Sequence, residues 1–280
     1  MLDRLLPNLL SVIVLFVTSI SFLPQLTHIW TKKTSSGISL YYVLFNLISA
    51  TEQLAVCIGL FVTPDKPDLF LHRPIIVTDW LNLCQVIVLW ILFLVYFASC
   101  LRFAPENHNG RNKHVIGIYI SFLLISLVPV FFFAACLIKG ATTNKEPLRW
   151  LTALFLGFHS LYATYIVALL TFAAIYYQAR EISSHLAPPP GLSVAGLAVQ
   201  FMVFCLVSVS WVFRVSFPYD EIALHRISLQ ALATWFTTVG WVVVYNGVYG
   251  LGQGLLFWLV MRQGSRAWAS NEGETRPLLR

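Results

Sequence analysis

Long apolar stretches alternate with short polar segments along the whole chain. Six of these stretches contain no Asp, Glu, Lys or Arg, and a seventh contains Glu52 alone. Each exceeds the roughly 20 residues that a helix needs to cross a hydrocarbon layer of about 30 Å, and none alternates with the period of two expected of a membrane strand. The pattern predicts seven transmembrane helices, at 8–30, 38–61, 78–101, 115–138, 151–177, 193–216 and 236–261.

The composition supports a membrane protein. The chain has 280 residues, of which 58% are hydrophobic and 11% charged, whereas a soluble domain carries about 25% charged residues. This excludes a soluble enzyme, a disordered chain and a nucleic-acid-binding domain. The five cysteines all fall inside predicted spans and are odd in number, which indicates small apolar side chains rather than disulfides or metal ligands. The sequence contains no nucleotide-binding loop, metal-ligand set or nucleophile–base pair, so we expect no enzyme and no cofactor.

The basic residues give the expected orientation. Ten Lys and Arg residues fall on one side of the seven spans and eight on the other, and the richer side is expected to be cytosolic. This places the C-terminus in the cytosol and the N-terminus in a lumen. The alternative for the first span is a cleaved signal peptide, but its apolar run continues through Leu23 and no small-residue cleavage site follows.

The last residues resemble a sorting signal. Glu274, three residues and the pair Leu278 and Leu279 match the acidic dileucine motif that coat adaptors read. The motif would direct the protein to a lysosome or vacuole. A polar terminus that contains two leucines by chance is the alternative interpretation.

Two short segments indicate an internal repeat. Gly37-Ile38-Ser39 opens the second predicted helix, and Gly191-Leu192-Ser193 opens the sixth. If the second loop is five residues longer than the first, Ala173-Ala174 stands opposite Pro24-Gln25. We therefore expect an all-α membrane protein with a three-helix bundle at 1–105, a linker helix at 106–145, a second, degenerate three-helix bundle at 146–264 and a cytosolic tail at 265–280.

Pro24-Gln25, followed by a basic Ser/Thr stretch and by Gly37-Ile38-Ser39, resembles a PQ-loop repeat. That family includes cystinosin, the lysosomal and vacuolar cationic amino-acid exporters and, more remotely, the SWEET sugar facilitators. The resemblance implies two three-helix bundles that alternate around a central site. In cystinosin-like members an acid that is tied to proton coupling stands where this chain has Gln200, and a further acid stands near Asp79.

Pro24 is the expected hinge. Proline in a helix removes one backbone hydrogen bond and bends the helix, here freeing the carbonyl of Ile20. The Gln25 amide is expected to donate to that carbonyl or to the neighbouring bundle, since polar groups in lipid need partners. The alternative is a static kink.

Three titratable residues are candidates for proton coupling. Glu52 is the one carboxylate well inside a span, and intramembrane acids commonly line pathways or relay protons; the alternative is a side chain that reaches back to the lumenal interface. His159 either pairs with Glu52 or packs as interhelical glue. Asp79 is either a second proton carrier, since Gln200 cannot titrate, or a cap at the start of its helix.

Four polar residues are candidates for solute binding. Asn46 and Gln200 each lie nine residues beyond the glycine that opens the repeat, so they are expected to face each other at the membrane midplane. Asn82 and Asn246 are expected on the same cavity. The alternatives are that Asn82 joins helices by hydrogen bonds and that the glycines around Asn246 serve close helix packing.

We therefore expect a secondary transporter that exports a small polar solute, such as a cationic amino acid or cystine, from a vacuole or lysosome with protons as the coupling ion. Its partners would be the solute, the lipid bilayer and coat adaptors, with no nucleic acid. Two alternatives stay open: an uncoupled sugar facilitator, for which Gln200 would suffice, and a non-transporting seven-helix receptor or scaffold.

Overall fold

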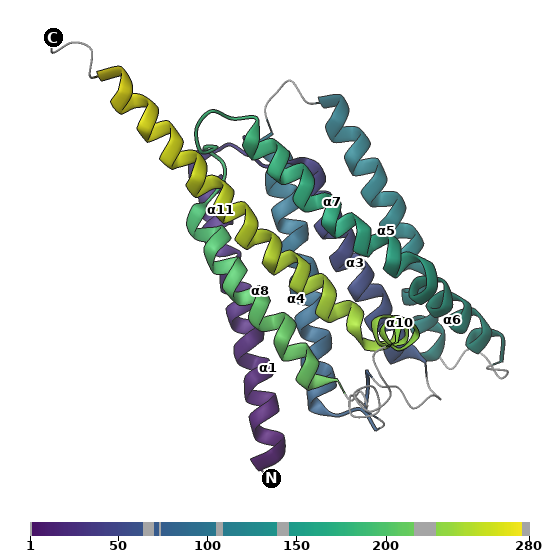
Figure 1. The fold of residues 1–280 in the computed structure, drawn as a ribbon. Helices are drawn as coiled ribbons and strands as arrows, with labels where there is room; N and C mark the ends of the chain where they lie inside the picture. Colours follow the sequence, from purple (N-terminus) through teal and green to yellow (C-terminus); the bar gives the residue numbers. More distant parts are fainter. Residues whose placement is uncertain are drawn as a thin grey trace.

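The computed structural model describes residues 2–63, 70–72, 74–104, 109–138, 146–215 and 228–275, with side chains except at 2–7, 109, 137–138 and 267–275. Within these ranges every regular element is a helix (Figure 1). The helices are α1 (Leu2–Ser21), α2 (Leu23–Lys32), α3 (Leu40–Val62), α4 (Val77–Arg102), α5 (Asn109–Ile138), α6 (Glu146–Phe158), η2 (His159–Ala163), α7 (Thr164–Ser183), α8 (Val194–Arg214), α10 (Leu229–Trp235), η3 (Phe236–Gly240) and α11 (Trp241–Thr275).

Seven runs of helix are long and apolar enough to cross a membrane, which confirms the predicted all-α fold with seven spans. Three of the runs are composite: α1 with α2, α6 with η2 and α7, and α10 with η3 and α11. The fifth and seventh runs, Glu146–Ser183 and Leu229–Arg266, extend beyond the predicted 151–177 and 236–261. Hydropathy detects the apolar part of a helix, whereas helices continue through polar residues outside the membrane. For the same reason the predicted tail at 265–280 begins as helix.

The helices pack in the same order in the first three and the last three spans. Helix α4 lies between α1 and α3, and α11 lies between α7 and α8. Two interfaces join the two sets: α1 and α2 pack on α8, and α3 packs on α7. Helix α5 packs mainly on α3, at the edge of the bundle (Figure 1).

Helix α3 is central and α5 is peripheral. In their most apolar segments, 83% of α3 is buried but only 28% of α5. The outer face of α5 exposes Leu124, Ile125, Val128, Phe131 and Phe132, as expected of a helix that faces lipid.

The two ends of the bundle differ. The chain starts at one end, here called the N-terminal end, and α11 leaves the bundle at the other, the C-terminal end (Figure 1). The connections 33–39 and 184–193 lie at the C-terminal end. Residues 70–72 and the start of α4 lie at the N-terminal end.

Candidate functional site

The break at Pro24 separates α1 from α2. Helix α1 ends at Ser21, Phe22 has turn geometry, and α2 resumes with Pro24 in its first turn. The predicted interruption is therefore present. The Gln25 side chain crosses to the start of α8, where its Nε2 donates to the Gly191 carbonyl at 2.9 Å and its Oε1 accepts from the Ser193 amide at 2.8 Å. The expected partners were the Ile20 carbonyl and the neighbouring bundle, and Gln25 bonds to the neighbouring bundle.

Gln178 makes the same pair of hydrogen bonds in the opposite direction. From the end of α7, its Nε2 donates to the Gly37 carbonyl at 2.7 Å, and its Oε1 accepts from the Ser39 amide at 2.8 Å. Gln178 therefore corresponds to Gln25, and the predicted register, which placed Ala173-Ala174 there, is wrong by four residues. Gln25 precedes Gly37 by 12 residues and Gln178 precedes Gly191 by 13, so the two connections are almost equal in length.

We call these four hydrogen bonds the glutamine clamps. Each clamp ties one set of three spans to the backbone of the other, and both glutamines are buried. Direct backbone contact reinforces them: the Gly191 amide donates to the Ser36 carbonyl at 3.1 Å. His28 Nε2 lies 2.9 Å from the Pro190 carbonyl oxygen. The two sets of spans are thus joined at the C-terminal end by hydrogen bonds that can break and reform.

Gly37 is the tightest point of this contact. It has φ +83°, and a Cβ there would lie 1.9 Å from Cβ of Pro189. Gly37→Ala is expected to lower the free energy of unfolding by about 2–4 kcal/mol, because it adds left-handed strain and overpacking. Gly117→Ala on α5 is the control, since a Cβ there meets nothing within 4 Å. Equal thermal unfolding midpoints of the two purified variants would contradict the close approach.

A small polar cavity lies in the middle of the bundle. It has a volume of about 10 Å³, room for about one water molecule. Asn46 and Asn246, two of the four residues expected to bind solute, both line it. The Asn46 Nδ2 donates to the Tyr42 carbonyl at 2.8 Å, and the Asn246 Nδ2 donates to the Val242 carbonyl at 2.7 Å. The full lining is Asn46, Ser49, Gln53, Leu89, Phe93, Phe204, Tyr245, Asn246 and Tyr249.

Gln200 lies behind one wall of this cavity. Its Oε1 accepts from the Tyr249 hydroxyl at 3.0 Å, and its Nε2 is buried with no partner among the described residues. Asn46 and Gln200 are both buried, at 4% and 3% exposure, so neither faces lipid. They are connected through Tyr249, which lines the cavity with Asn46, and no hydrogen bond between the two is seen in the described part of the chain.

Glu52 and His159 form a buried pair between α3 and η2. The His159 Nδ1 lies 2.9 and 2.8 Å from the two carboxylate oxygens of Glu52. The two residues are 0% and 1% exposed, and the imidazole packs 4.1 Å from the Phe155 ring. His159 opens a π-helical turn, a feature often found at functional sites. The structure thus shows the pairing that the sequence left open. The Glu52 side chain is thus buried inside the bundle and does not reach back toward the lumenal surface.

Asp79 caps the start of α4. Its carboxylate accepts from the Ile76 amide at 3.0 Å and lies 3.0 Å from Nδ1 of His72. This is the capping arrangement offered as the alternative to a proton role. Nearby, the Phe70 ring is buried between Trp211 and Trp241, with centroid distances of 5.7 and 5.4 Å. Aromatic packing therefore covers the N-terminal end of the bundle.

Asn82 lies one turn further along α4 and does not line the central cavity. It is 1% exposed, and its Oδ1 lies 3.5 Å from Nη1 of Arg214. Arg214 donates from the same nitrogen to Oε1 of Gln85. Asn82 therefore belongs with a buried arginine that the sequence analysis treated only as a loop charge.

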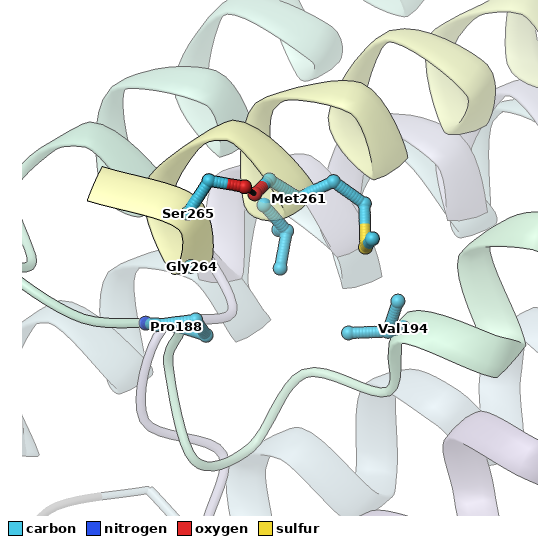
Figure 2. Close-up of a pocket in the computed structure, with 6 residues that line it drawn as sticks. Pro188, Val194, Met261, Gly264 and Ser265 are labelled. Carbon is cyan, nitrogen blue, oxygen red and sulfur yellow. Dashed lines mark hydrogen bonds between the residues drawn. The ribbon is translucent and has the colours of Figure 1, made fainter. Parts of the chain in front are cut away.

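A larger pocket at the C-terminal end is apolar. It has a volume of about 410 Å³ and lies between α11 and the connection to α8, where Pro188 and Val194 face Met261 and Gly264 (Figure 2). The hydroxyl of Ser265 there donates to the Met261 carbonyl at 3.1 Å. This lining offers little to a polar solute, so the central cavity remains the candidate solute site. Among the described residues, no group of three His, Cys, Asp or Glu could hold a metal ion.

The structure describes only part of the predicted sorting motif. Glu274 belongs to α11, whereas Leu278 and Leu279 lie outside the described residues. The dileucine signal stays a prediction.

The comparisons with known proteins concern the first two spans. Residues 6–63 match the family model described as PQ loop repeat, a segment that contains Pro24, Gln25, Asn46 and Glu52. No curated protein matches the chain. On its seven apolar helices, the chain is a multi-pass membrane protein, and its segment 6–63 is similar to a PQ-loop repeat.

Proposed function

We propose that this protein is a secondary transporter that moves a small polar solute by alternating access. The observation that carries the proposal is the pair of glutamine clamps at the C-terminal end of a bundle that has a small polar cavity in its middle. Gln25 and Gln178 add hydrogen bonds between the two sets of spans where α2 packs on α8 and α3 packs on α7, and hydrogen bonds between packed helices can break and reform when the helices move.

The helix order supports two equivalent three-helix units with α5 as the linker. In each unit the third span packs between the other two, and the interfaces between the units, α1–α8 and α3–α7, pair the first span of one unit with the second span of the other. A pseudo-two-fold relation of this kind places the solute site between the units. Asn46 and Asn246 are the solute contacts that we propose on the cavity wall, with Gln200 joining when Tyr249 moves.

The proposed coupling ion is the proton, carried by Glu52 and His159. The pair joins α3 of the first unit to η2 of the second, so its protonation changes the attraction between the two units. Asp79 is a weaker candidate, because its carboxylate is already engaged by the helix cap and His72.

The proposed solute is an amino acid, and the proposed location is a vacuolar or lysosomal membrane with the N-terminal end in the lumen. The family resemblance and the excess of basic residues on the C-terminal side support this. An adaptor that reads Glu274, Leu278 and Leu279 would complete the route to that membrane.

Counterflow in proteoliposomes tests the proposal. Liposomes that contain the purified chain and unlabelled solute are expected to accumulate a labelled amino acid from the standard set. Accumulation should be faster when the exterior is more acidic than the interior, because the proposed transporter moves solute and proton in the same direction. Equal rates with and without the gradient would indicate an uncoupled facilitator. No flux of any amino acid or hexose above protein-free liposomes would contradict transport and favour a scaffold.

A further inference from the structure

A buried arginine stands at the N-terminal end of the bundle, and none of the acids that the structure describes is its partner. Arg214 is the last residue of α8, and it is 8% exposed. Its guanidinium carbon lies 5.3 Å from the Trp211 ring centroid. Its polar neighbours, Gln85 and Asn82 on α4, are uncharged amides, and both contact the Nη1 nitrogen.

The other edge of the guanidinium is unused. Nε and Nη2 of Arg214 are buried and have no hydrogen-bond partner among the described residues. These two nitrogens present parallel N–H groups on one side of the planar group, and that spacing matches the two oxygens of a carboxylate. The amides of Gln85 and Asn82 hold the opposite side, so the free edge has a fixed direction.

An unpaired buried cation is costly in a membrane protein, where charged side chains normally pair with one another or face a pathway. The acid on the same stretch of α4, Asp79, is bound by Ile76 and His72. The arrangement therefore provides a positive charge and two free donors but no anion. A bound anion would supply what the side chain lacks.

The position of this edge fits a solute path. Gln85 lies four residues before Leu89, which lines the central cavity, a separation of about 6 Å along α4. Gln85, which accepts a hydrogen bond from Arg214, thus stands about one helical turn from the cavity-lining Leu89, and Arg214 lies on the N-terminal side of the cavity.

We propose that Arg214 binds the carboxylate of the transported solute through Nε and Nη2 as the solute passes from the N-terminal end to the cavity. The solute is then an organic carboxylate rather than a sugar. Gln85 and Asn82 are positioning residues that orient the guanidinium. This inference rests on the proposed transport function and assigns the chemical class of its solute.

Ligand-dependent thermal unfolding of the purified full chain in detergent tests it. The probes are the standard L-amino acids, lactate and succinate, each compared with its amide at matched concentration. At least one carboxylate is expected to raise the unfolding midpoint while its amide does not. Arg214→Gln is expected to weaken the affinity for that carboxylate by at least about tenfold. Arg214→Lys keeps the charge but loses the two parallel N–H groups, so it is expected to weaken the affinity by less.

Arg262→Gln is the matched control. Arg262 also stacks on a tryptophan, 5.2 Å from the Trp258 ring centroid, but it is exposed, so its removal should leave the affinity unchanged. Equal stabilisation by amide and carboxylate, stabilisation by no carboxylate, or undiminished affinity in Arg214→Gln would each overturn the proposal. Asp220 and Glu221 follow Arg214 closely in the sequence, so Asp220→Asn and Glu221→Gln test whether either acid is the permanent partner of Arg214. Removing a permanent partner would raise the affinity for the carboxylate, and such a rise in either variant would also overturn the proposal.

The two proposals fail in different ways. Binding in detergent requires no transport, so carboxylate binding without flux in liposomes would contradict the transporter and leave the Arg214 site standing. Flux of a hexose that outcompetes every carboxylate would contradict the Arg214 site and leave transport standing.

Discussion

His159→Ala is expected to lower the free energy of unfolding by about 3–5 kcal/mol, because it leaves the Glu52 carboxylate buried without its partner. Glu52→Gln is expected to cost less, since the imidazole that remains can be neutral and can still bond to an amide. The loss of unfolding free energy in the double variant, Glu52→Gln with His159→Ala, should be smaller than the sum of the two single losses. Unfolding of the purified variants in detergent, followed by circular dichroism, measures all three.

A second Glu–His pair in the same chain is the control. His185 Nε2 lies 3.7 Å from Glu181 Oε1, with both side chains partly exposed. His185→Ala should change the free energy of unfolding by no more than about 0.5 kcal/mol. If His159→Ala and His185→Ala behaved alike, the Glu52–His159 pair would not be an energetically important contact.

The pair also bears on transport. If Glu52 and His159 carry the coupling proton, Glu52→Gln should retain exchange of solute for solute and lose its acceleration by a pH gradient. An unchanged response to the gradient would exclude Glu52 from the coupling role.

Gln25→Ala and Gln178→Ala are expected to have nearly equal effects, because each removes the same two hydrogen bonds from opposite sides. Each variant leaves a buried carbonyl and a buried amide without a partner, at a cost of about 1–3 kcal/mol for each group. This cost applies only while the C-terminal end is closed. The equilibrium should therefore shift toward the open form by at least about tenfold for each 1.4 kcal/mol.

Gln263→Ala is the control for this shift. Gln263 donates to the carbonyls of Ile182 and His185, which lie in the same set of spans as Gln263 itself. Its loss should destabilise the C-terminal end locally without separating the two sets. Unequal effects of Gln25→Ala and Gln178→Ala would show that the two clamps are not equivalent.

The fold followed from sequence where a local rule applied. Apolar runs with at most one charged residue predicted all seven spans, and the rule for proline in helices predicted the break before Pro24. The sequence left two partners for the Gln25 amide, the Ile20 carbonyl and the neighbouring bundle, and the structure shows the second. The register of the second repeat failed because Gln178 has no proline before it, and a single glutamine at the end of a helix carries no signal until its tertiary contacts are known.

The site was less accessible to sequence reasoning for the same reason. Glu52 was recognisable because a carboxylate inside a span is rare, and the structure supplied its partner, His159. Arg214 stood at the end of a predicted span and was counted only for topology. Its importance comes from burial against Trp211 and from the amides of Asn82 and Gln85, and a single sequence does not encode those contacts in a readable pattern.

The most direct test of alternating access is the distance between the two connections at the C-terminal end. Spin labels would be placed at Lys32 and Leu186, both exposed, in the full chain in liposomes after replacement of the five native cysteines. Pulsed electron resonance should then show a short distance and a second, longer one. The longer population should grow in Gln25→Ala and Gln178→Ala but not in Gln263→Ala. A single distance that neither clamp variant changes would contradict the account.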